Sequence, residues 1–262
     1  MFTERYGNYQ NYYSMRGDGS VLDSRIKALP YDLFENTSVL DVGCNNGTIT
    51  TQVASLFNVK YALGIDIDLT LIKKAEKHLE FVASRIGPSN DHCPMISRHN
   101  FYPISSIKKF SRIQKKFQGS LNEQGFPHNV QFQAVDIQRW QSKKRFHTIL
   151  ALSITKWIHL NGLDEGLLAF FKNMHAVLET DGALIIEPQS WDSYLKAAKK
   201  NSIFERSLPK IRIRPENFPE ILEQNGFDLQ TVVSSEDTKP KNYEQKGFLK
   251  RDVFVYRKKR NP

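Results

Sequence analysis

A glycine-containing turn followed by an acidic residue is the most informative pattern in the sequence. Residues 39–48 read VLDVGCNNGT, so a short apolar run leads into Gly43 and Gly47 and then into a helical pattern. Glycine is needed where the chain turns sharply and lets a ligand approach the backbone. Nineteen residues after Gly47, Asp66 ends the next apolar run, where a carboxylate can accept hydrogen bonds from both hydroxyls of a ribose. Together these features predict a site for a cofactor that contains a nucleoside.

The residues around this turn narrow the choice of cofactor. Neither the dinucleotide fingerprint G-x-G-x-x-G nor the phosphate-binding pattern G-x-x-x-x-G-K-[ST] fits the turn. Asp41 instead precedes Val42 and Gly43, which is similar to the first motif of class I methyltransferases, with Asn45 in place of their usual middle glycine. Asparagine tolerates a positive φ better than most residues. The expected cofactor is S-adenosylmethionine, whose cationic sulfonium favours nearby carboxylates.

The elements that must position these residues alternate along the chain. Short apolar runs bounded by turn residues predict strands at 38–42, 61–66, 130–136, 146–152 and 182–187, with late strands at 229–233 and 252–256. Helical spacing predicts helices at 47–57, 69–85, 163–178 and 215–225. This alternation predicts an α/β fold, a doubly wound, mostly parallel seven-stranded sheet with ligand sites at the carboxyl ends of its strands. Asp136, at the end of the third predicted strand, suits either a contact to the adenine amino group or a helix N-cap.

Length and composition predict one domain over residues 1–262, with a mass of 30.3 kDa. The longest apolar runs are far shorter than the eighteen or so residues of a membrane-spanning helix, and the N-terminus lacks the apolar stretch of a signal peptide. An intracellular location is therefore expected. Cys44 and Cys93 cannot form a disulfide framework, and no Cys/His cluster has metal-ligand spacing, so no metal site is expected.

The charge balance favours an acidic partner. Lys and Arg number 37 against 28 Asp and Glu, a net charge of +9, which points to nucleic acid more than to a membrane surface. Residues 87–128 interrupt the alternation as a basic insertion before the third strand, with six Lys or Arg and no acid between 92 and 122. This insertion is either a solvated surface loop or an RNA-contacting arm, partly helical near 104–117. Basic residues also gather at 196–214 and 239–260, which are either a track along RNA phosphates or solvated surface.

Four longer motifs extend the pattern beyond the generic fold. They read YGNYQNYY from Tyr6 with Arg16 after it, GIDID from Gly64, LSITKWIHLN from Leu152, and EPQSW from Glu187. With the glycine turn they closely resemble the bicoid-interacting family of RNA methyltransferases, which includes the 7SK methylphosphate capping enzyme. The resemblance spans about residues 6–257. It implies methyl transfer from S-adenosylmethionine to a 5′-terminal phosphate of a small non-coding RNA such as a small nuclear or telomerase RNA.

The resemblance also implies a setting and a set of contacts. The setting is a ribonucleoprotein in the nucleus, with the cytoplasm as an alternative, and a La-related protein as a partner. The cofactor contacts are Tyr12, Arg25, Gly43, Cys44, Asn45, Asp66, Ile67, Asp136, Ile137 and Leu152, and the turn adds Asp41 and Gly47. The sequence departs from relatives where Asp136-Ile137 replace Asn-Tyr, Gly162-Leu163 replace Trp-Gly and Ser190 replaces proline. The second departure leaves open how contacts near His159 carry over.

Methylation of a phosphate sets a specific chemical task. The acceptor oxygen is already anionic at pH 7, so no general base is required, and the enzyme must hold it in line with the S–CH₃ bond and exclude water. Lys156, His159 and Arg16 are expected to bind the non-attacking oxygens, because a cation on the attacking oxygen would weaken it as a nucleophile. Tyr12 is expected to close the pocket over the methyl group. The predicted RNA contacts are Arg16, Lys156, His159, Gln189 and Trp191, the last on the loop after the fifth strand and stacked on the first base.

Alternatives remain at each level. Lys156 also suits a solvated surface lysine, His159 and Trp191 suit packed side chains, and Arg16 suits a loop-bracing arginine. Residues 1–30 are either a lid over the cofactor and the RNA end or a tyrosine packing stripe. The rival functions are methylation of an RNA base, ribose, protein or small molecule, and a mainly structural RNA-binding subunit. Resemblance to the capping enzyme favours the γ-phosphate over a monophosphate as acceptor.

Overall fold

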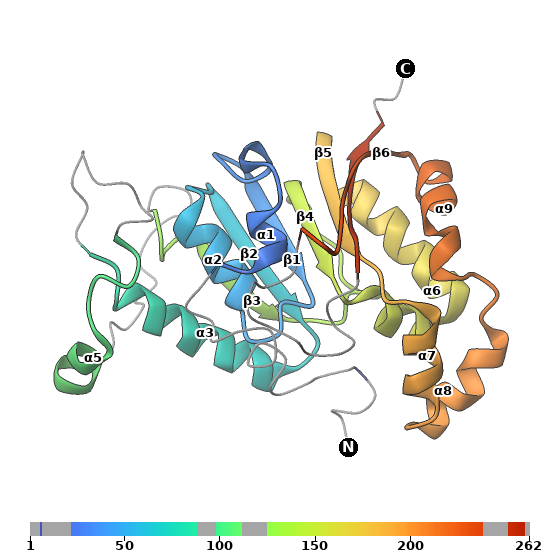
Figure 1. The fold of residues 1–262 in the computed structure, drawn as a ribbon, viewed down its shortest axis with the longest axis horizontal. Coiled ribbons are helices and arrows are strands. Elements are labelled where there is room, and N and C mark those ends of the chain that lie inside the picture. The colour runs from blue at the N-terminus through green and yellow to red at the C-terminus, as the bar shows by residue number, and fades with distance from the viewer. Residues whose placement is uncertain (1–5, 7–21, 88–97, 112–124, 238–250, 260–262) are drawn as a thin grey trace.

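The fold is a single β-sheet with helices on both faces (Figure 1). A computed structural model describes residue 6 and residues 22–87, 98–111, 125–237 and 251–259. Statements about structure below concern these residues.

Seven described strands form the sheet, in the order β3-β2-β1-β4-β5-β7-β6. β1 to β5 run parallel, and β7 runs antiparallel to both β5 and β6. The strands are β1 Ser38–Val42, β2 Tyr61–Asp66, β3 Val130–Ala134, β4 Phe146–Leu152, β5 Leu178–Glu187, β6 Phe227–Val233 and β7 Val253–Lys258. The strand order reverses between β1 and β4, and doubly wound sheets bind ligands at the carboxyl ends beside such a switch point. The predicted fold class is confirmed.

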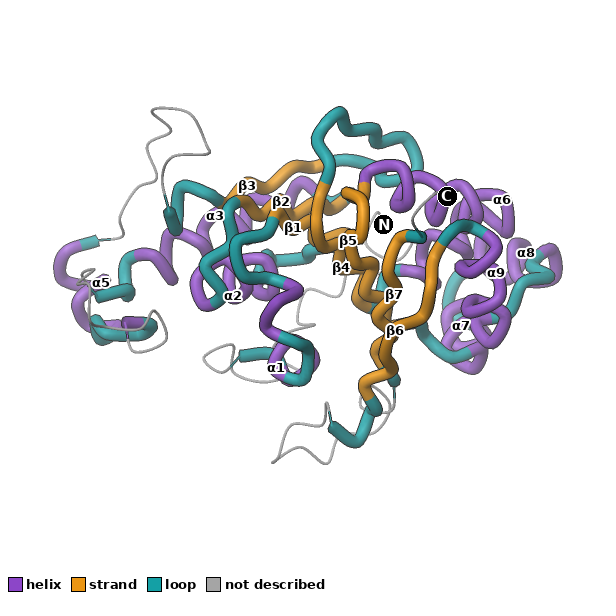
Figure 2. The backbone as a smooth tube through the Cα atoms, turned by 90° about the horizontal axis from the view of Figure 1, so that it is seen from above, coloured by secondary structure: helices purple, strands orange, loops and turns teal. Residues whose placement is uncertain are grey.

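The helices connect these strands and cover the sheet. The α-helices are α1 Ser24–Lys27, α2 Thr48–Leu56, α3 Leu69–Ala83, α5 Ile104–Phe110, α6 Thr155–Val177, α7 Trp191–Ala198, α8 Ser202–Ser207 and α9 Phe218–Gln224, and short 3₁₀ turns lie at Tyr31–Leu33, Leu208–Lys210 and Pro215–Asn217. Figure 2 shows α1 and α2 on one side of the sheet and α6 and α9 on the other.

Two apolar cores lie on the two faces of the sheet. One packs α6 and α9 against β1, β2, β4 and β5, with Phe171 at 0% exposure among its residues. The other packs α1, α2 and α3 against the opposite face, around residues such as Val39 and Val53. A third, smaller cluster joins the start of α6 to α7 and α8 through Trp157, Tyr194 and Phe204. The central strands β1, β2 and β4 are buried on both faces and are apolar nearly throughout, as the sequence indicated, whereas the edge strands β3 and β6 are partly exposed.

Most element boundaries match the predictions, and the mismatches have physical causes. Helix α6 begins at Thr155 rather than 163, and Leu163 interrupts it with φ 56°. Its first turns are buried all round, so they lack the amphipathic spacing that signals a helix. β5 begins four residues before the predicted 182, in a polar stretch where Asp181 has φ 60°. α7 and α8 were not predicted, and α5 at Ile104–Phe110 lies within the stretch predicted to be partly helical, of which residues 112–117 lie outside the described residues.

Neither a membrane-spanning helix nor a group of metal-binding side chains is present among the described residues. None of the described helices combines the length and apolarity that crossing a bilayer requires. Within the described residues, no three His, Cys, Asp or Glu side chains are grouped to hold a metal ion. Cys44 is buried as a free thiol, and Cys93 lies outside the described residues.

Candidate functional site

The glycine turn after β1 is shaped by the backbone and by close packing. Gly43 has φ 73°, and its amide donates to the Ile65 carbonyl at 2.8 Å, which ties the turn to the end of β2. A Cβ on Gly43 would lie 2.7 Å from Cδ1 of Ile154, so a larger residue is excluded by both the positive φ and the space. Gly47 also has a positive φ, and a Cβ there would lie 2.6 Å from the Phe132 ring. Gly47 therefore serves packing of α2, whereas Gly43 faces the cavity described next.

Asp66 ends β2 and faces the same cavity. Its two carboxylate oxygens accept the amide of Asn45 at 2.9 Å and the amide of Asp68 at 3.0 Å, so the side chain is fixed in orientation. Burial raises the pKa of Asp66, although both backbone hydrogen bonds oppose the shift. Asn45 holds φ 53°, a conformation that asparagine adopts more readily than most residues. A fixed carboxylate at the end of β2 is the arrangement that the ribose hypothesis requires.

A cavity of about 1120 Å³, counting its open mouth, lies over the carboxyl ends of the parallel strands. Its size suits a small-molecule cofactor together with part of a second ligand. Asp66 and Asp136 line it beside Ile67 and Ile137, from the ends of β2 and β3, which lie on one side of β1 in the sheet. Lys156 and Arg251 line it from the segments after β4 and before β7, on the other side of β1. The strand order therefore separates the carboxylates, at the nucleoside end, from the cations, at the basic end.

Lys156, in the first turn of α6, is a buried cation at this basic end. It is 5% exposed, and its Nζ donates to the Ser193 hydroxyl at 2.7 Å and lies 4.2 Å from the Trp157 ring centroid. Burial, together with the positive charges of Arg251 and Lys200, lowers the pKa of Lys156 to about 7. An incoming anion would favour the charged ammonium. The alternative of a solvated surface lysine is wrong.

A chain of polar contacts joins Arg251 to Arg25 in α1 across the carboxyl ends of β4 and β5. Arg251 donates through Nη1 to the Ser153 hydroxyl at 3.1 Å, and that hydroxyl donates to the Glu187 carboxylate. Glu187 pairs with Arg25 at 2.8 Å, and Arg25 also pairs with Asp23 at 2.9 Å. Ser153 holds φ 60° at the end of β4, a conformation uncommon for serine. The network fixes Arg251 beside Lys156.

Several of the predicted residues line the cavity together. They are Gly43, Asn45, Asp66, Ile67, Asp136, Ile137, Leu152, Lys156 and Gln189. The Gln189 amide is already engaged, because its Oε1 accepts from Thr155 and from the Lys156 amide and its Nε2 donates to the Ser153 carbonyl. Gln189 therefore holds the start of α6 in place. The Asp136 carboxylate accepts the Gln138 amide at 3.0 Å in a turn rather than at a helix N-terminus.

Four predicted cofactor residues lie outside the lining of the cavity. Arg25 and Asp41 are buried, the latter accepting the Thr50 hydroxyl at 2.6 Å, and burial raises the pKa of Asp41 to about 6. Cys44 is fully buried, and Gly47 packs against α3. These residues support the turn from behind. Direct cofactor contact by them remains a prediction.

His159 is corrected by the structure. Its side chain is 0% exposed, with Nδ1 3.2 Å from the Tyr194 hydroxyl and Nε2 2.8 Å from Asp164. Burial lowers the pKa of His159, so the neutral ring is favoured. Asp164 in turn accepts the amides of Arg212 and Ile213. In this structure His159 braces α6 against neighbouring segments and does not reach a ligand in the cavity.

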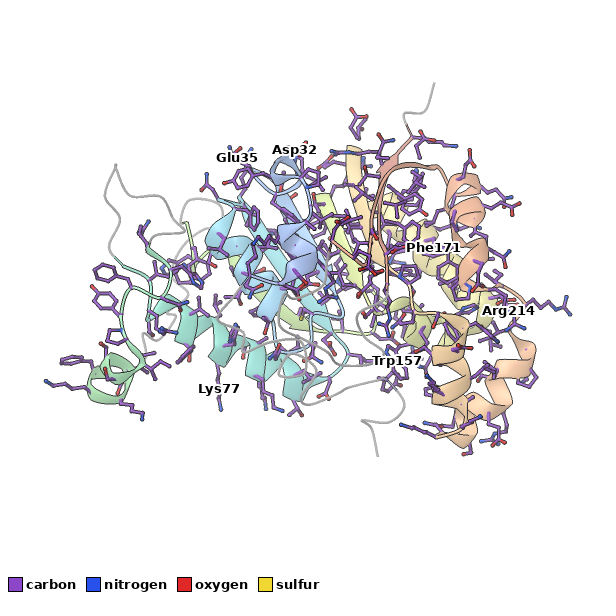
Figure 3. The ribbon with its side chains drawn as sticks, viewed as in Figure 1. Asp32, Glu35, Lys77, Trp157, Phe171 and Arg214 are labelled. Atoms are coloured by element: carbon purple, nitrogen blue, oxygen red, sulfur yellow. The ribbon has the colours of Figure 1, made fainter. Side chains whose placement is uncertain are left out.

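Trp191 lies elsewhere than predicted, and its stacking on a base stays a prediction. It begins α7 rather than lying on a loop, and it does not line the cavity. Its ring stacks with Tyr194 at 5.0 Å between centroids, and the Arg214 guanidinium carbon lies 3.4 Å from its centroid. An indole already in contact with two partners is a packed residue in this structure. Trp157 is buried and lines the cavity (labelled in Figure 3).

Tyr12 and Arg16 lie outside the described residues, so their predicted roles stay predictions. Tyr6, the one described residue before Leu22, lines the cavity. Sequence reasoning missed further lining residues, namely Gln138, Asn161, Ser193 and Arg251. Arg251 lies nearly 100 residues from Ser153 in sequence, and no local spacing reveals that contact. For Gln138 the sequence offers only a weak signal, namely the two glycines Gly162 and Gly166. Because they have no side chain, they leave the space that the Gln138 side chain occupies.

Comparison with solved structures identifies the class of fold. The methyltransferase NodS from Bradyrhizobium japonicum, in complex with S-adenosyl-L-homocysteine, superposes with a TM-score of 0.57 at 13% identity, covering 98% of this chain and 96% of that one. The sheet order, the antiparallel β7 and the glycine turn after β1 are shared features of the S-adenosylmethionine-dependent class I methyltransferase fold, which this chain has.

Sequence comparison identifies the family within that class. The model of the Bicoid-interacting protein 3 (Bin3) family matches residues 146–258. A probable RNA methyltransferase from Arabidopsis thaliana is 31% identical over 88% of this chain and 75% of its own length. The human 7SK snRNA methylphosphate capping enzyme is 30% identical over 98% of this chain, which spans 40% of that protein. The chain belongs to the Bin3 family, and the resemblance drawn from its motifs is confirmed.

Proposed function

We propose that this protein transfers a methyl group from S-adenosylmethionine to the 5′-terminal phosphate of a small non-coding RNA, with the γ-phosphate as the favoured acceptor. The polarity of the cavity carries this proposal. Carboxylates and apolar side chains suit a nucleoside at one end, while Lys156 and Arg251 suit an anion at the other. The human relative is named as a methylphosphate capping enzyme, which is the same chemistry.

The residues of the cavity fit S-adenosylmethionine. Asp66 is oriented toward the position of a ribose, Ile67 and Ile137 offer apolar surface to an adenine, and Gly43 leaves room for the methionine portion. When bound, the cofactor would supply a methyl group on a positively charged sulfur. Asp136 is proposed to accept a hydrogen bond from the adenine amino group, although its other partner is the Gln138 amide.

The basic end of the cavity is proposed to position the acceptor phosphate of the RNA. Lys156 lies in α6 and Arg251 lies just before β7, so the two cations approach from different elements. They can therefore hold two different oxygens of one phosphate. The third oxygen is then left free to attack. Because cations act in a poorly hydrated cavity, each hydrogen bond to the phosphate is stronger than in water. The Lys156 ammonium gains its proton most readily when the anion arrives, since the pKa of the lysine in the free protein is about 7.

A mainly structural RNA-binding role is the second candidate, and the buried lysine argues against it. Keeping a lysine at 5% exposure is costly unless a ligand compensates the charge. A protein that served only to bind the RNA body would gain nothing from this arrangement. The rival methyltransferases for a base, ribose, protein or small molecule would not require two adjacent cations at the end of the cavity.

The setting of the reaction extends the proposal. The relatives suggest small nuclear RNA as the substrate class, so we place the activity in the nucleus within a ribonucleoprotein, with a La-related protein as the proposed partner. Tyr12 and Arg16 are proposed to complete the phosphate site, and residues 1–30 to cover it. Arg25 is proposed to act from behind the cavity through Glu187.

The direct test compares RNA ends. The protein is incubated with methyl-labelled S-adenosylmethionine and one RNA carrying a 5′-triphosphate, diphosphate, monophosphate or hydroxyl. We expect labelling of the triphosphate RNA and none of the hydroxyl RNA. Labelling that is independent of the 5′ end would overturn the phosphate acceptor, and the absence of any labelling would favour the structural role.

A further inference from the structure

The outer face of α3 and the helix α5 beyond it form a surface that the proposed cavity does not use. We call this the α3–α5 surface, and its residues are Lys73, Lys74 and Lys77 on α3 with Phe101, Tyr102, Ile104, Lys108, Lys109 and Phe110 at the start of and within α5. Figures 1 and 2 both show α5 beyond the end of α3, at the far side of the molecule from α6 to α9.

The chain before α5 is anchored to the end of α3 by paired backbone contacts. The Gly87 amide donates to the Arg98 carbonyl at 2.9 Å, and the Arg98 guanidinium donates back to the Gly87 carbonyl at 3.0 Å. In the same way the Tyr102 amide donates to the Arg85 carbonyl at 3.1 Å, and Arg85 donates to the Tyr102 carbonyl at 3.0 Å. A Cβ on Gly87 would lie 2.7 Å from the Phe101 ring. The segment is therefore seated on α3 in a defined position.

This seated segment exposes aromatic side chains. Phe110 is 74% exposed, Phe101 60% and Tyr102 41%, and Ile104 is also exposed. The Phe101 and Tyr102 rings meet edge to face at 5.0 Å between centroids. Exposing several neighbouring aromatic side chains to water is unfavourable in free energy, and such apolar patches mark binding sites. None of these rings belongs to the three cores of the fold.

The charge around the rings is positive. The Lys109 ammonium lies 5.3 Å from the Phe110 ring centroid, and Lys108 precedes it on α5. Lys73, Lys74 and Lys77 are exposed on α3, with Glu76 among them, and Figure 3 shows Lys77 pointing away from the sheet. Aromatic rings set among cations suit a polyanion with flat bases rather than an acidic peptide alone.

The α3–α5 surface begins beside the cavity. Asp66 and Ile67 line the cavity immediately before α3 begins at Leu69, and the 15 residues of α3 span about 21 Å. The three lysines lie along this path and the aromatic rings at its far end. A polynucleotide whose 5′ phosphate lies at the basic end would first cross the mouth of the cavity past its nucleoside end, and would then meet the lysines and after them the rings.

We propose that the α3–α5 surface binds the body of the RNA substrate, with the lysines on phosphates and the exposed rings stacked on unpaired bases. This inference rests on the proposed function for the identity of the polyanion. Stacking on aromatic rings tolerates any base, so the surface adds affinity for RNA with an unpaired stretch near its 5′ end rather than recognition of one sequence.

The test replaces Phe101, Tyr102 and Phe110 together by alanine and measures binding of a 5′-triphosphate RNA with an unpaired stretch of about ten nucleotides. We expect binding to weaken by about tenfold or more, since each stacked base is lost. Methyl transfer to a triphosphorylated dinucleotide, which reaches only the cavity, should keep its wild-type rate. Tyr31→Ala removes an aromatic side chain of similar exposure from another part of the surface and should leave RNA binding unchanged.

A second variant separates stacking from apolar docking. Replacing the three rings by leucine keeps apolar surface but removes the flat faces, so RNA binding should weaken nearly as much as in the alanine variant. In the Lys73→Gln, Lys77→Gln variant, the slope of log affinity against log salt should fall by about 0.7 for each lost phosphate contact. Unchanged RNA binding in the alanine variant would overturn the inference, as would full RNA binding by the leucine variant, which would show that the rings contribute apolar contact and not stacking. Binding is measured without catalysis, so failure of methyl transfer alone would refute the proposed function and leave this inference standing.

Discussion

Replacing Lys156 by methionine should stabilise the protein while removing its activity. Burial holds the pKa of Lys156 at about 7 against its usual 10.5, so folding at pH 7 costs about 4 kcal/mol for this one group. Methionine keeps the stem packed and avoids that cost. It gives up the hydrogen bond to Ser193 and the contact with the Trp157 ring, each worth about 1 kcal/mol. The expected net gain is about 2 kcal/mol at pH 7.

The gain should depend on pH in a defined direction. Between pH 7 and 10.5 the unfolded chain holds the Lys156 proton more strongly than the folded protein, so the wild type becomes more stable relative to the variant as the pH rises. From pH 7 to pH 9.5 the stability difference should change by about 3 kcal/mol, from an advantage of about 2 kcal/mol for Lys156→Met to a disadvantage of about 1 kcal/mol. Urea denaturation of both proteins at the two pH values measures this difference, and any other titrating group cancels in the comparison. An advantage of the variant that stays constant with pH would refute the buried, neutral lysine.

Further substitutions test individual contacts of the cavity. Asp66→Ala should weaken binding of S-adenosyl-L-homocysteine by at least about tenfold in calorimetry, because the ribose partner is lost; unchanged affinity would contradict the placement of the nucleoside. In Gly162→Ala the new methyl group overlaps Nε2 of Gln138, so cofactor affinity should fall, and adding Gln138→Ala should restore part of it; strictly additive losses would contradict this coupling. Arg251→Gln should raise the KM for triphosphate RNA by about tenfold or more and leave the KM for the cofactor unchanged. The same variant should move the alkaline limb of the pH–rate profile to higher pH, because the charge of Arg251 lowers the pKa of Lys156. A selective rise in the cofactor KM would assign Arg251 to the methionine carboxylate instead.

The fold was predictable because its signals are local. The boundaries of β1, β2 and β4 follow directly from apolar runs that end at turn residues. The turn after β1 is equally local, since Gly43 and Asn45 both hold the positive φ that their residue types favour. Asp66 and Asp136 lie at strand ends, and parallel strands bring their carboxyl ends to one edge of the sheet. The nucleoside end of the cavity is therefore readable from spacing alone.

Only one of the two cations at the basic end was predicted, because this end is assembled from residues that lie far apart in the sequence. Lys156 follows a strand and was found, but Arg251 reaches the cavity through Ser153, which no spacing reveals. His159 belongs to the same motif as Lys156 and lies three residues further along α6, yet its ring is held by Tyr194 and Asp164 and does not line the cavity. Residue type and motif membership do not fix the direction of a side chain.

Mass spectrometry of the 5′-terminal nucleotide released from the RNA product tests the central claim most directly. The account predicts one added methyl group on the terminal phosphate of the triphosphate chain, with unmodified base and ribose. A methyl group found on the base or the ribose, with an unmodified triphosphate, would contradict it.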